Sequence, residues 1–318
     1  MKRNYIYLFF LFILITVPVP GLQCQVKPVY YHSQYLFNYY LINPAIAGSN
    51  TYPLILLSSR QNVQYIDGSP RTQILSLHSR IPYFGKVKKR TQPKPAFSNI
   101  AVGGYLFNDS DGPFRKTGFQ ATYAYHLPLI SDFLSNLSFG ISFNAFTYRI
   151  DFSALHTLND PLINGANGRT FVPDANFGIF YYGPDAYVSF AVMQLFETPV
   201  KWSDDVFARV PVERDYFLIA GYKYNISRLF SIDPSFLFRT AGENISEFYR
   251  HFDINLRINY TDFSVGISYR NNQSIAVLGQ YRYQNILAGL IYSYPVGEIS
   301  NYHSGIVEVM AGYNFGGK

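Results

Sequence analysis

FDINLRINYTDFSVGISYR, residues 252–270, is the stretch that most clearly predicts the fold class of this chain. Apolar and polar residues alternate through its first half, and a period of two predicts a β-strand. The alternation begins again after the short connection YTD, which predicts a second strand from Phe263 to Arg270. The apolar side of the first strand consists of Phe252, Ile254, Leu256, Ile258 and Tyr260.

The same alternation recurs in GFQATYAYHL (118–127), LSFGISF (137–143) and SIAVLGQYRY (274–283), and less cleanly in IVEVMAGYNF (306–315). A soluble β-sandwich also alternates, so the composition of the two faces has to distinguish the classes. Here the polar face is Ser, Gly, Asn, Gln and Arg rather than Lys and Glu, and the apolar face repeatedly ends in Tyr or Phe. This pattern is typical of a membrane barrel with a polar lumen and aromatic interfaces. We therefore expect an all-β, transmembrane antiparallel barrel.

The barrel hypothesis predicts which side chains of residues 252–260 face lipid. The side chains expected to face lipid are Phe252, Ile254, Leu256 and Ile258, and Asn255 should face the lumen. If Ile254 lies near the midplane, Ile254→Arg is expected to cost about 2 to 4 kcal/mol, whereas a change at Asn255 is expected to cost far less.

The first residues, MKRN, are followed by the apolar run YIYLFFLFILITVPVP and then GLQCQ. This order is typical of a secretory signal peptide, which we place at residues 1–24 with cleavage before Gln25. Cys24 raises the alternative of a lipoprotein, although Gln23 is bulky for the position before a lipidated cysteine. No cysteine follows residue 24, which excludes disulfides, cysteine nucleophiles and thiolate metal sites from the mature chain.

Charge and composition agree with an exported membrane protein. Removing Lys2 and Arg3 from the 26 basic residues leaves 24 against 20 acidic ones, a net charge of about +4 that is too small to indicate nucleic-acid binding. The chain carries 29 Tyr and 28 Phe but only 14% charged residues. It is therefore rich in residues that favour β-strands and poor in the charge that a water-soluble surface needs.

About fourteen strands of spanning length are predicted within residues 52–318. An even number places both termini in the periplasm, with short turns inside and long loops outside. RNN at Arg270 and GKVKKRTQPKPAF after the second strand break this pattern of lengths. The strands are expected to begin near Tyr52, Pro70, Ser98, Phe114, Leu134, Asn176, Ala186, Tyr216, Leu229, Glu247, Asp262, Gln273, Asn285 and Ser304.

An N-terminal segment, residues 25–51, precedes the barrel and contains the cluster NPAIAG (43–48). Asn43 can accept a hydrogen bond from the free amides of a first helical turn, Pro44 suits the first helical position, and Gly48 can adopt the left-handed conformation that ends it. We expect one helical turn or compact loop, on the periplasmic side or against the barrel mouth.

The sequence shows no residue pattern typical of catalysis or cofactor binding. The six histidines are scattered without a close pair at metal-ligand spacing, so they are expected to be polar lumen or loop residues. His78 and Ser79 would point to opposite faces of a strand, and NDSDG (108–112) is better explained by a hairpin turn than by a calcium loop. No phosphate loop or dinucleotide fingerprint is present. We expect no enzyme, no cofactor and no metal.

Several stretches in order resemble the PorP/SprF family of type IX secretion and gliding-motility membrane proteins. The resemblance covers nearly all of residues 34–316, and one departure is Val63, where the family usually has Trp. At its start the matching residues are Gln34, Phe37, Asn38, Asn43, Pro44, Ala45, Ala47 and Gly48. Further along they are GSPRTQILSLH, GGYLFNDSDGPFRKTGFQATYAYHL, VPDANFGIFYY, SIDPSFLFR, FDINLRINY, VGISYRNNQSIAVLGQYRY and MAGYNFGG.

The resemblance implies an outer-membrane barrel of the Bacteroidota secretion machinery that aids export or surface attachment of adhesins and other cargo through their C-terminal domains. Its partners would be secretion components in the outer membrane and periplasm, cargo and the lipid bilayer. A general porin or small-solute channel is the alternative. Candidate partner surfaces are the loops Asp151–Asp174 and Glu197–Asp215; the candidate partner contacts are Lys86, Lys88, Lys89, Arg90 and Trp202.

Overall fold

The computed structural model describes residues 33–50, 52–63, 68–82, 97–129, 135–151, 168–201, 209–210, 212–242, 251–271, 273–296 and 305–316. Nearly all of these residues form β-structure, apart from three single-turn 3-10 helices near the start. In this part of the chain no helix combines the length and apolar character that a bilayer crossing requires. The predicted signal peptide lies outside the described residues.

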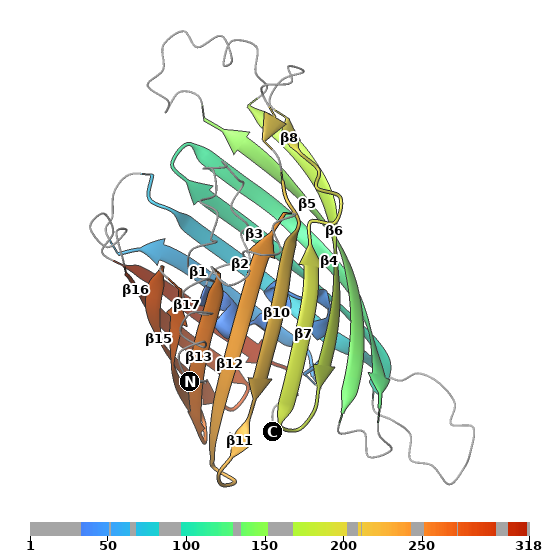
Figure 1. Ribbon diagram of the computed structural model, residues 1–318, viewed down its shortest axis with the longest axis vertical. Coiled ribbons are helices and arrows are strands. Elements are labelled where there is room, and N and C mark those ends of the chain that lie inside the picture. The colour runs from blue at the N-terminus through green and yellow to red at the C-terminus, as the bar shows by residue number, and fades with distance from the viewer. Residues whose placement is uncertain are drawn as a thin grey trace, which may run out of the picture.

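Fourteen antiparallel strands form the wall of a closed barrel (Figure 1). They are β1 (Leu54–Asn62), β2 (Arg71–Pro82), β3 (Phe97–Asp111), β4 (Phe114–Pro128), β5 (Asn136–Ile150), β6 (Arg169–Tyr182), β7 (Ala186–Met193), β10 (Asp215–Tyr222), β12 (Phe230–Ala241), β13 (Phe252–Tyr260), β14 (Phe263–Arg270), β15 (Ser274–Tyr283), β16 (Ile286–Pro295) and β17 (Ile306–Asn314).

Each wall strand pairs with the next along the chain, and β17 returns to pair with β1 over its whole length. The short β11 (Tyr224–Asn225) pairs only with β12, while β8 (Val200–Lys201) and β9 (Arg209–Val210) form a separate ribbon. Subtracting β11 from the fifteen strands of the main sheet leaves fourteen, and the β10–β12 pairing completes the ring. The predicted fold class and strand count are confirmed.

The two ends of the barrel differ in their connections. At one end, called the short-turn end below, tight turns join β6 to β7, β13 to β14 and β15 to β16. At the other, the long-loop end, longer connections join β5 to β6, β7 to β10, β12 to β13 and β16 to β17. β3 and β4 meet here through Gly112-Pro113, so NDSDG does lead into a hairpin turn.

Two predicted strand starts are wrong by several residues. The tenth strand, β13, starts at Phe252 rather than near Glu247. The sixth strand starts at Arg169 rather than near Asn176, and it pairs with β5 along its whole length. Pro173 lacks a backbone donor and suggests an end to the strand. The proline is tolerated because β6 pairs with β7 only from Phe177 onward, so its outer half behaves as an edge on that side. The predicted loop Asp151–Asp174 is correspondingly shorter.

Facing follows the predicted alternation. On β13, Ile254 and Leu256 are 43% and 40% exposed, whereas Asp253 and Asn255 are buried. The same holds on β4, where Tyr123 is exposed and its neighbours point inward. Apolar side chains therefore cover the outside of the wall and polar ones line the lumen.

The register places the membrane midplane away from Ile254. Its cross-strand row includes Tyr269 and Tyr294, aromatic residues of the kind that mark an interface. At the short-turn end a second aromatic row contains Tyr260, Phe263 and Tyr281. Ile267, paired with Leu256 and Val277, lies between these rows. The condition attached to Ile254 is not met, and Ile267 is the better midplane probe.

We predict that Ile267→Arg lowers the free energy of unfolding in liposomes by about 2 to 4 kcal/mol, because an arginine would enter the hydrocarbon core. Ile254→Arg, nearer an interface, should cost about 0 to 1 kcal/mol. Gln280→Arg is the matched control, since Gln280 lies on the lumen side of β15 and should change stability little. Asn255 is unsuitable as a control because it contacts Tyr35. Equal costs at Ile267 and Gln280 would refute the facing.

Candidate functional site

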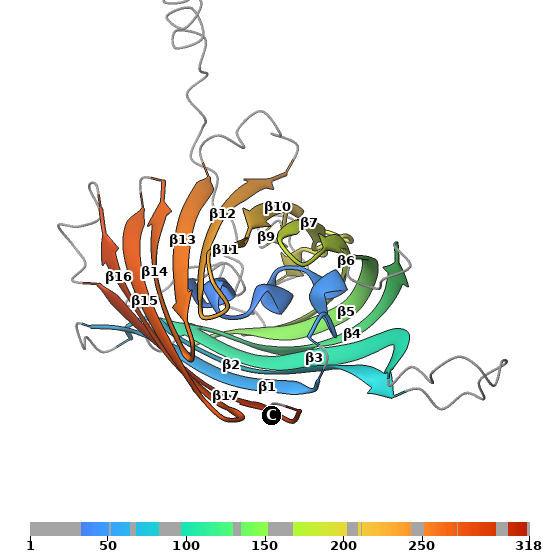
Figure 2. The ribbon, with the colours of Figure 1, turned by 90° about the horizontal axis from the view of Figure 1, so that it is seen from below.

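Residues Ser33–Gly48, called the lumenal segment below, lie inside the barrel (Figure 2). They form η1 (Ser33–Leu36), η2 (Tyr39–Leu41) and η3 (Pro44–Ile46), and most of their side chains are buried. The expected position on the periplasmic side or at the mouth is therefore corrected. The segment enters the lumen because its polar groups find partners on strands around the wall, which local sequence reasoning cannot see.

The predicted capped turn forms at η3. Asn43 Oδ1 accepts a hydrogen bond from the Ala45 amide at 2.8 Å, and Pro44 takes the first helical position. Asn43 Nδ2 lies 2.7 Å from Ser189 Oγ on β7 and 3.1 Å from the carbonyl oxygen of Ile179 on β6. One amide side chain thus caps the turn and fastens it to two strands.

Two glycines on the wall make room for this turn. Gly140 on β5 and Gly178 on β6 are register partners that face the lumen. A Cβ on Gly140 would collide with the backbone of Pro44 and Ala45, and one on Gly178 with the side chain of Asn43. The backbone of the segment therefore approaches the wall more closely than any side chain would allow. A glycine inside a strand is a signal of such an approach, and sequence reasoning did not use it.

The end of the segment rests on polar side chains from β2 and β4. His126 Nε2 lies 2.8 Å from the carbonyl oxygen of Ala47, and His78 Nδ1 accepts a hydrogen bond from the Gly48 amide at 3.1 Å. Arg80 Nε donates to the carbonyl oxygen of Gly48 at 3.0 Å. Gly48 has φ +72°, the predicted left-handed conformation. His78 and His126 are thus the polar lumen residues that were expected, whereas His32, His156 and His303 lie outside the described residues.

The start of the segment is held on the opposite wall. Tyr35 donates a hydrogen bond from its hydroxyl to Asp253 Oδ2 on β13 at 2.7 Å, and Asp253 also forms an ion pair with Arg270 on β14 at 3.0 Å. Arg257 donates to the carbonyl oxygen of Leu36. These anchors lie nearer the long-loop end than η3 does, so the segment crosses the lumen obliquely toward the short-turn end.

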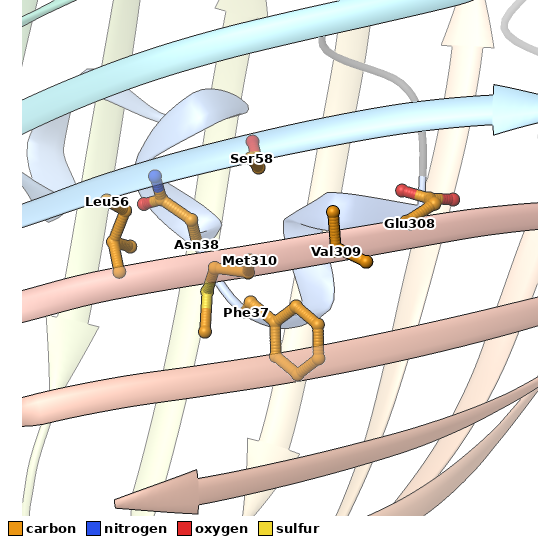
Figure 3. Close-up of a pocket in the computed structure, with 7 residues that line it drawn as sticks. All are labelled: Phe37, Asn38, Leu56, Ser58, Glu308, Val309 and Met310. Atoms are coloured by element: carbon orange, nitrogen blue, oxygen red, sulfur yellow. The ribbon is translucent and has the colours of Figure 1, made fainter.

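Between its two ends the segment contacts the wall again. Asn38 Nδ2 donates to Ser76 Oγ on β2 at 2.8 Å, and Tyr40 donates to Thr122 Oγ1 on β4 at 2.7 Å. Figure 3 shows Phe37 and Asn38 beside β1 and β17, where the remaining cavity is about 10 Å³, room for about one water molecule. The segment is therefore packed against this wall rather than loosely enclosed.

Charged lumen side chains nearer the long-loop end are paired across strands. Arg60 on β1 lies 4.0 Å from Glu308 on β17, and Arg239 on β12 lies 2.7 Å from Asp215 on β10. Lys116 on β4 places Nζ 4.0 Å from the ring centroid of Phe146. Opposite charges held this way limit the net field that the lumen presents to an ion.

Comparison with known proteins identifies the family. The family described as type IX secretion system membrane protein PorP/SprF matches residues 25–313. The chain belongs to the PorP/SprF family. The resemblance found in the sequence is confirmed, and the barrel with its lumenal segment is the structure of a PorP/SprF protein.

Solved structures similar to this PorP/SprF protein include a transporter, a channel and a porin. The Ralstonia pickettii toluene transporter TbuX is 10% identical, with 93% of this chain and 96% of that chain covered and a TM-score of 0.49. The CymD monoaromatic hydrocarbon channel is 13% identical, with 90% and 94% covered and a TM-score of 0.49. A Rhodopseudomonas blastica porin mutant is 7% identical, with 83% and 99% covered and a TM-score of 0.33. No curated protein matches the chain.

The predicted partner contacts Lys86, Lys88, Lys89, Arg90 and Trp202 all lie outside the described residues. Within the described ranges, no group of three or more His, Cys, Asp or Glu side chains is arranged to hold a metal ion. The candidate functional feature that the structure adds is the lumenal segment. Its cap at Asn43 was predictable, but its wall partners were not.

We predict that Gly178→Ala displaces the turn at η3, because the new methyl group would collide with Asn43. Amide exchange of Ala45 to Gly48 should accelerate about tenfold or more, the equivalent of about 1.4 kcal/mol, while ladder amides of β5 and β6 keep their protection. Gly279→Ala on β15 is the control, since its added Cβ would meet nothing within 4 Å. Unchanged exchange in Gly178→Ala would contradict the described seating of the turn.

Proposed function

We propose that this chain is a non-enzymatic outer-membrane component of the type IX secretion and gliding machinery, and that it docks partner proteins rather than passing solutes. Its long-loop end would face outside and its short-turn end the periplasm, as is usual for bacterial barrels. Its partners would be other components of the machinery and the C-terminal domains of cargo such as adhesins.

Occupation of the lumen by the chain's own residues is the observation that carries this proposal. The lumenal segment is hydrogen-bonded to opposite walls, from Asp253 on β13 to Thr122 on β4. A porin instead needs a continuous water-filled channel through its lumen. The paired lumen charges, such as Arg239 with Asp215, also leave less of the wall free to attract ions. These features favour docking over a general porin or small-solute channel.

The proposed docking surfaces are the long outer connections and the basic loop that carries Lys86, Lys88, Lys89 and Arg90. The start of the β7–β10 connection is fixed to β6, because Asp174 Oδ1 accepts from the Phe196 amide at 2.9 Å and Thr198 donates to the carbonyl oxygen of Pro173 at 2.8 Å. A connection anchored in this way supports a surface of defined shape, which partner recognition requires.

We predict that the purified wild-type chain shows no steady open-pore conductance in planar bilayers, because the lumenal segment obstructs the path. Combining Asn43→Ala with Gly178→Val should produce open events, since the cap and its wall contacts are removed together. Gly279→Ala should behave as wild type. Steady conductance of the wild-type chain would favour the porin alternative.

We predict that neutralising Lys86, Lys88, Lys89 and Arg90 together weakens co-purification with periplasmic secretion components, and that the loss resembles the effect of raised salt. Heat resistance of the barrel should be unchanged, because all four residues lie between β2 and β3.

Shortening the β5–β6 connection should instead release adhesin from the cell surface. Normal co-purification and normal adhesin display in the two variants would contradict the docking proposal.

A further inference from the structure

Four arginines lie in one cross-strand row on the outside of the barrel. Arg71 on β2 pairs with Ser110 on β3, which pairs with Arg115 on β4. Arg115 pairs with Arg149 on β5, and Arg149 with Arg169 on β6. All four arginines are exposed, and they share the outward face with the lipid-facing side chains of the same strands. The row crosses five neighbouring strands close to the long-loop end.

The described part of the chain does not neutralise this row. None of the four arginines forms an ion pair with a residue in the described ranges, whereas Arg60, Arg239 and Arg270 in the lumen all do. Asp111 and Asp151 lie beyond the row, at the ends of β3 and β5. Like charges directly opposite each other destabilise a sheet, and three of these arginines are consecutive register partners. An anion outside the chain would offset that repulsion.

The depth of the row points to a lipid headgroup. The lipid-facing row of Leu75, Leu106 and Phe119 lies four residues further into each strand. Between them lies a polar row with Gln73, Asn108, Thr117 and Thr147. Four residues correspond to about 14 Å along a strand, or about 10 Å along the membrane normal for a tilt of about 40°. The arginines therefore lie where phosphates above an apolar band are found.

The opposite flank of the barrel is different. There the outward row near the same end contains Ile254, Tyr269, Ile275 and Tyr294, with no basic residue among them. The strands differ too, with 15 residues in β4 and β5 but 8 in β14. The basic surface thus belongs to the flank whose strands extend furthest.

We propose that Arg71, Arg115, Arg149 and Arg169 bind phosphate groups of a phosphorylated glycolipid in the outer leaflet. This inference rests on the proposed outer-membrane location and orientation. A lipid is favoured over an acidic protein because the row follows the wall at constant depth directly above the lipid-facing band. Guanidinium groups bind phosphate oxygens through paired, charge-assisted hydrogen bonds, which suits a row of regularly spaced arginines.

The test compares two triple variants of the full-length chain in detergent. In the first, Arg115, Arg149 and Arg169 are changed to Gln; in the matched control, Lys223, Arg228 and Arg282, exposed near the short-turn end, are changed to Gln. Retention of lipid A and of dephosphorylated lipid A is measured by native mass spectrometry, with inorganic phosphate as competitor. We expect the first variant to bind lipid A at least tenfold more weakly, from the loss of several charge-assisted bonds, and the control to bind as wild type does.

Wild type should also prefer lipid A over its dephosphorylated form. Equal binding by the two triple variants, or no preference for the phosphorylated lipid, would overturn the proposal. Displacement of lipid A by inorganic phosphate alone would replace it with a free-anion site. Normal lipid A binding by the arginine variant together with loss of an acidic protein partner would replace it with a protein surface.

A labelling experiment separates this inference from the proposed function. Asp111→Cys lies at the β3–β4 hairpin and Ser227→Cys at the other end of the barrel, and both are exposed. In intact cells a membrane-impermeant maleimide should label Asp111→Cys and not Ser227→Cys. The reverse pattern would refute the orientation and both proposals with it. The expected pattern combined with failed lipid A binding would refute the arginine site alone.

Discussion

In a lipid bilayer every backbone N–H and C=O group needs a partner within the protein, and that constraint determines the architecture of this chain. A flat sheet would leave two edges in hydrocarbon. The pairing of β17 with β1 at the chain ends, and of β10 with β12, removes both. The part of β6 before Phe177, which does not pair with β7, also obeys the constraint. There the carbonyl oxygen of Ala175 accepts a hydrogen bond from the Leu195 amide, and the side chain of Asp174 accepts one from the Phe196 amide.

Closure creates a polar interior, and the chain fills part of it with its own N-terminal residues. Polar groups of the lumenal segment take the place that water would otherwise occupy beside Ser76, Thr122 and Ser138. Because its contacts include β13 on one side of the ring and β2 and β4 on the other, the segment also braces walls that do not pair with each other. This internal occupancy, more than the barrel itself, is what favours the proposed docking role over a channel.

The outside of the barrel is not uniform. Around β13 to β16 an apolar band is framed by aromatic residues such as Tyr269 and Tyr281. The strands from β2 to β6 are longer and extend beyond the apolar band toward the long-loop end. Their outward side chains there are first polar and then arginines such as Arg149. The two flanks therefore present different chemistry near the long-loop end of the barrel.

The sequence by itself determined the features that depend on neighbours along the chain. Period-two alternation is local, so the strand class, the count of fourteen and the lipid-facing side of β13 could all be predicted. The cap at Asn43 is equally local. Only the tertiary structure decided where that turn lies, because Gly140 meets Gly178 through the register of β5 with β6. The arginine row depends on the same kind of information, since residues as far apart as Arg71 and Arg169 share a depth only once strand register is set. Register arises from pairing and closure of the whole wall, which no single stretch of sequence encodes.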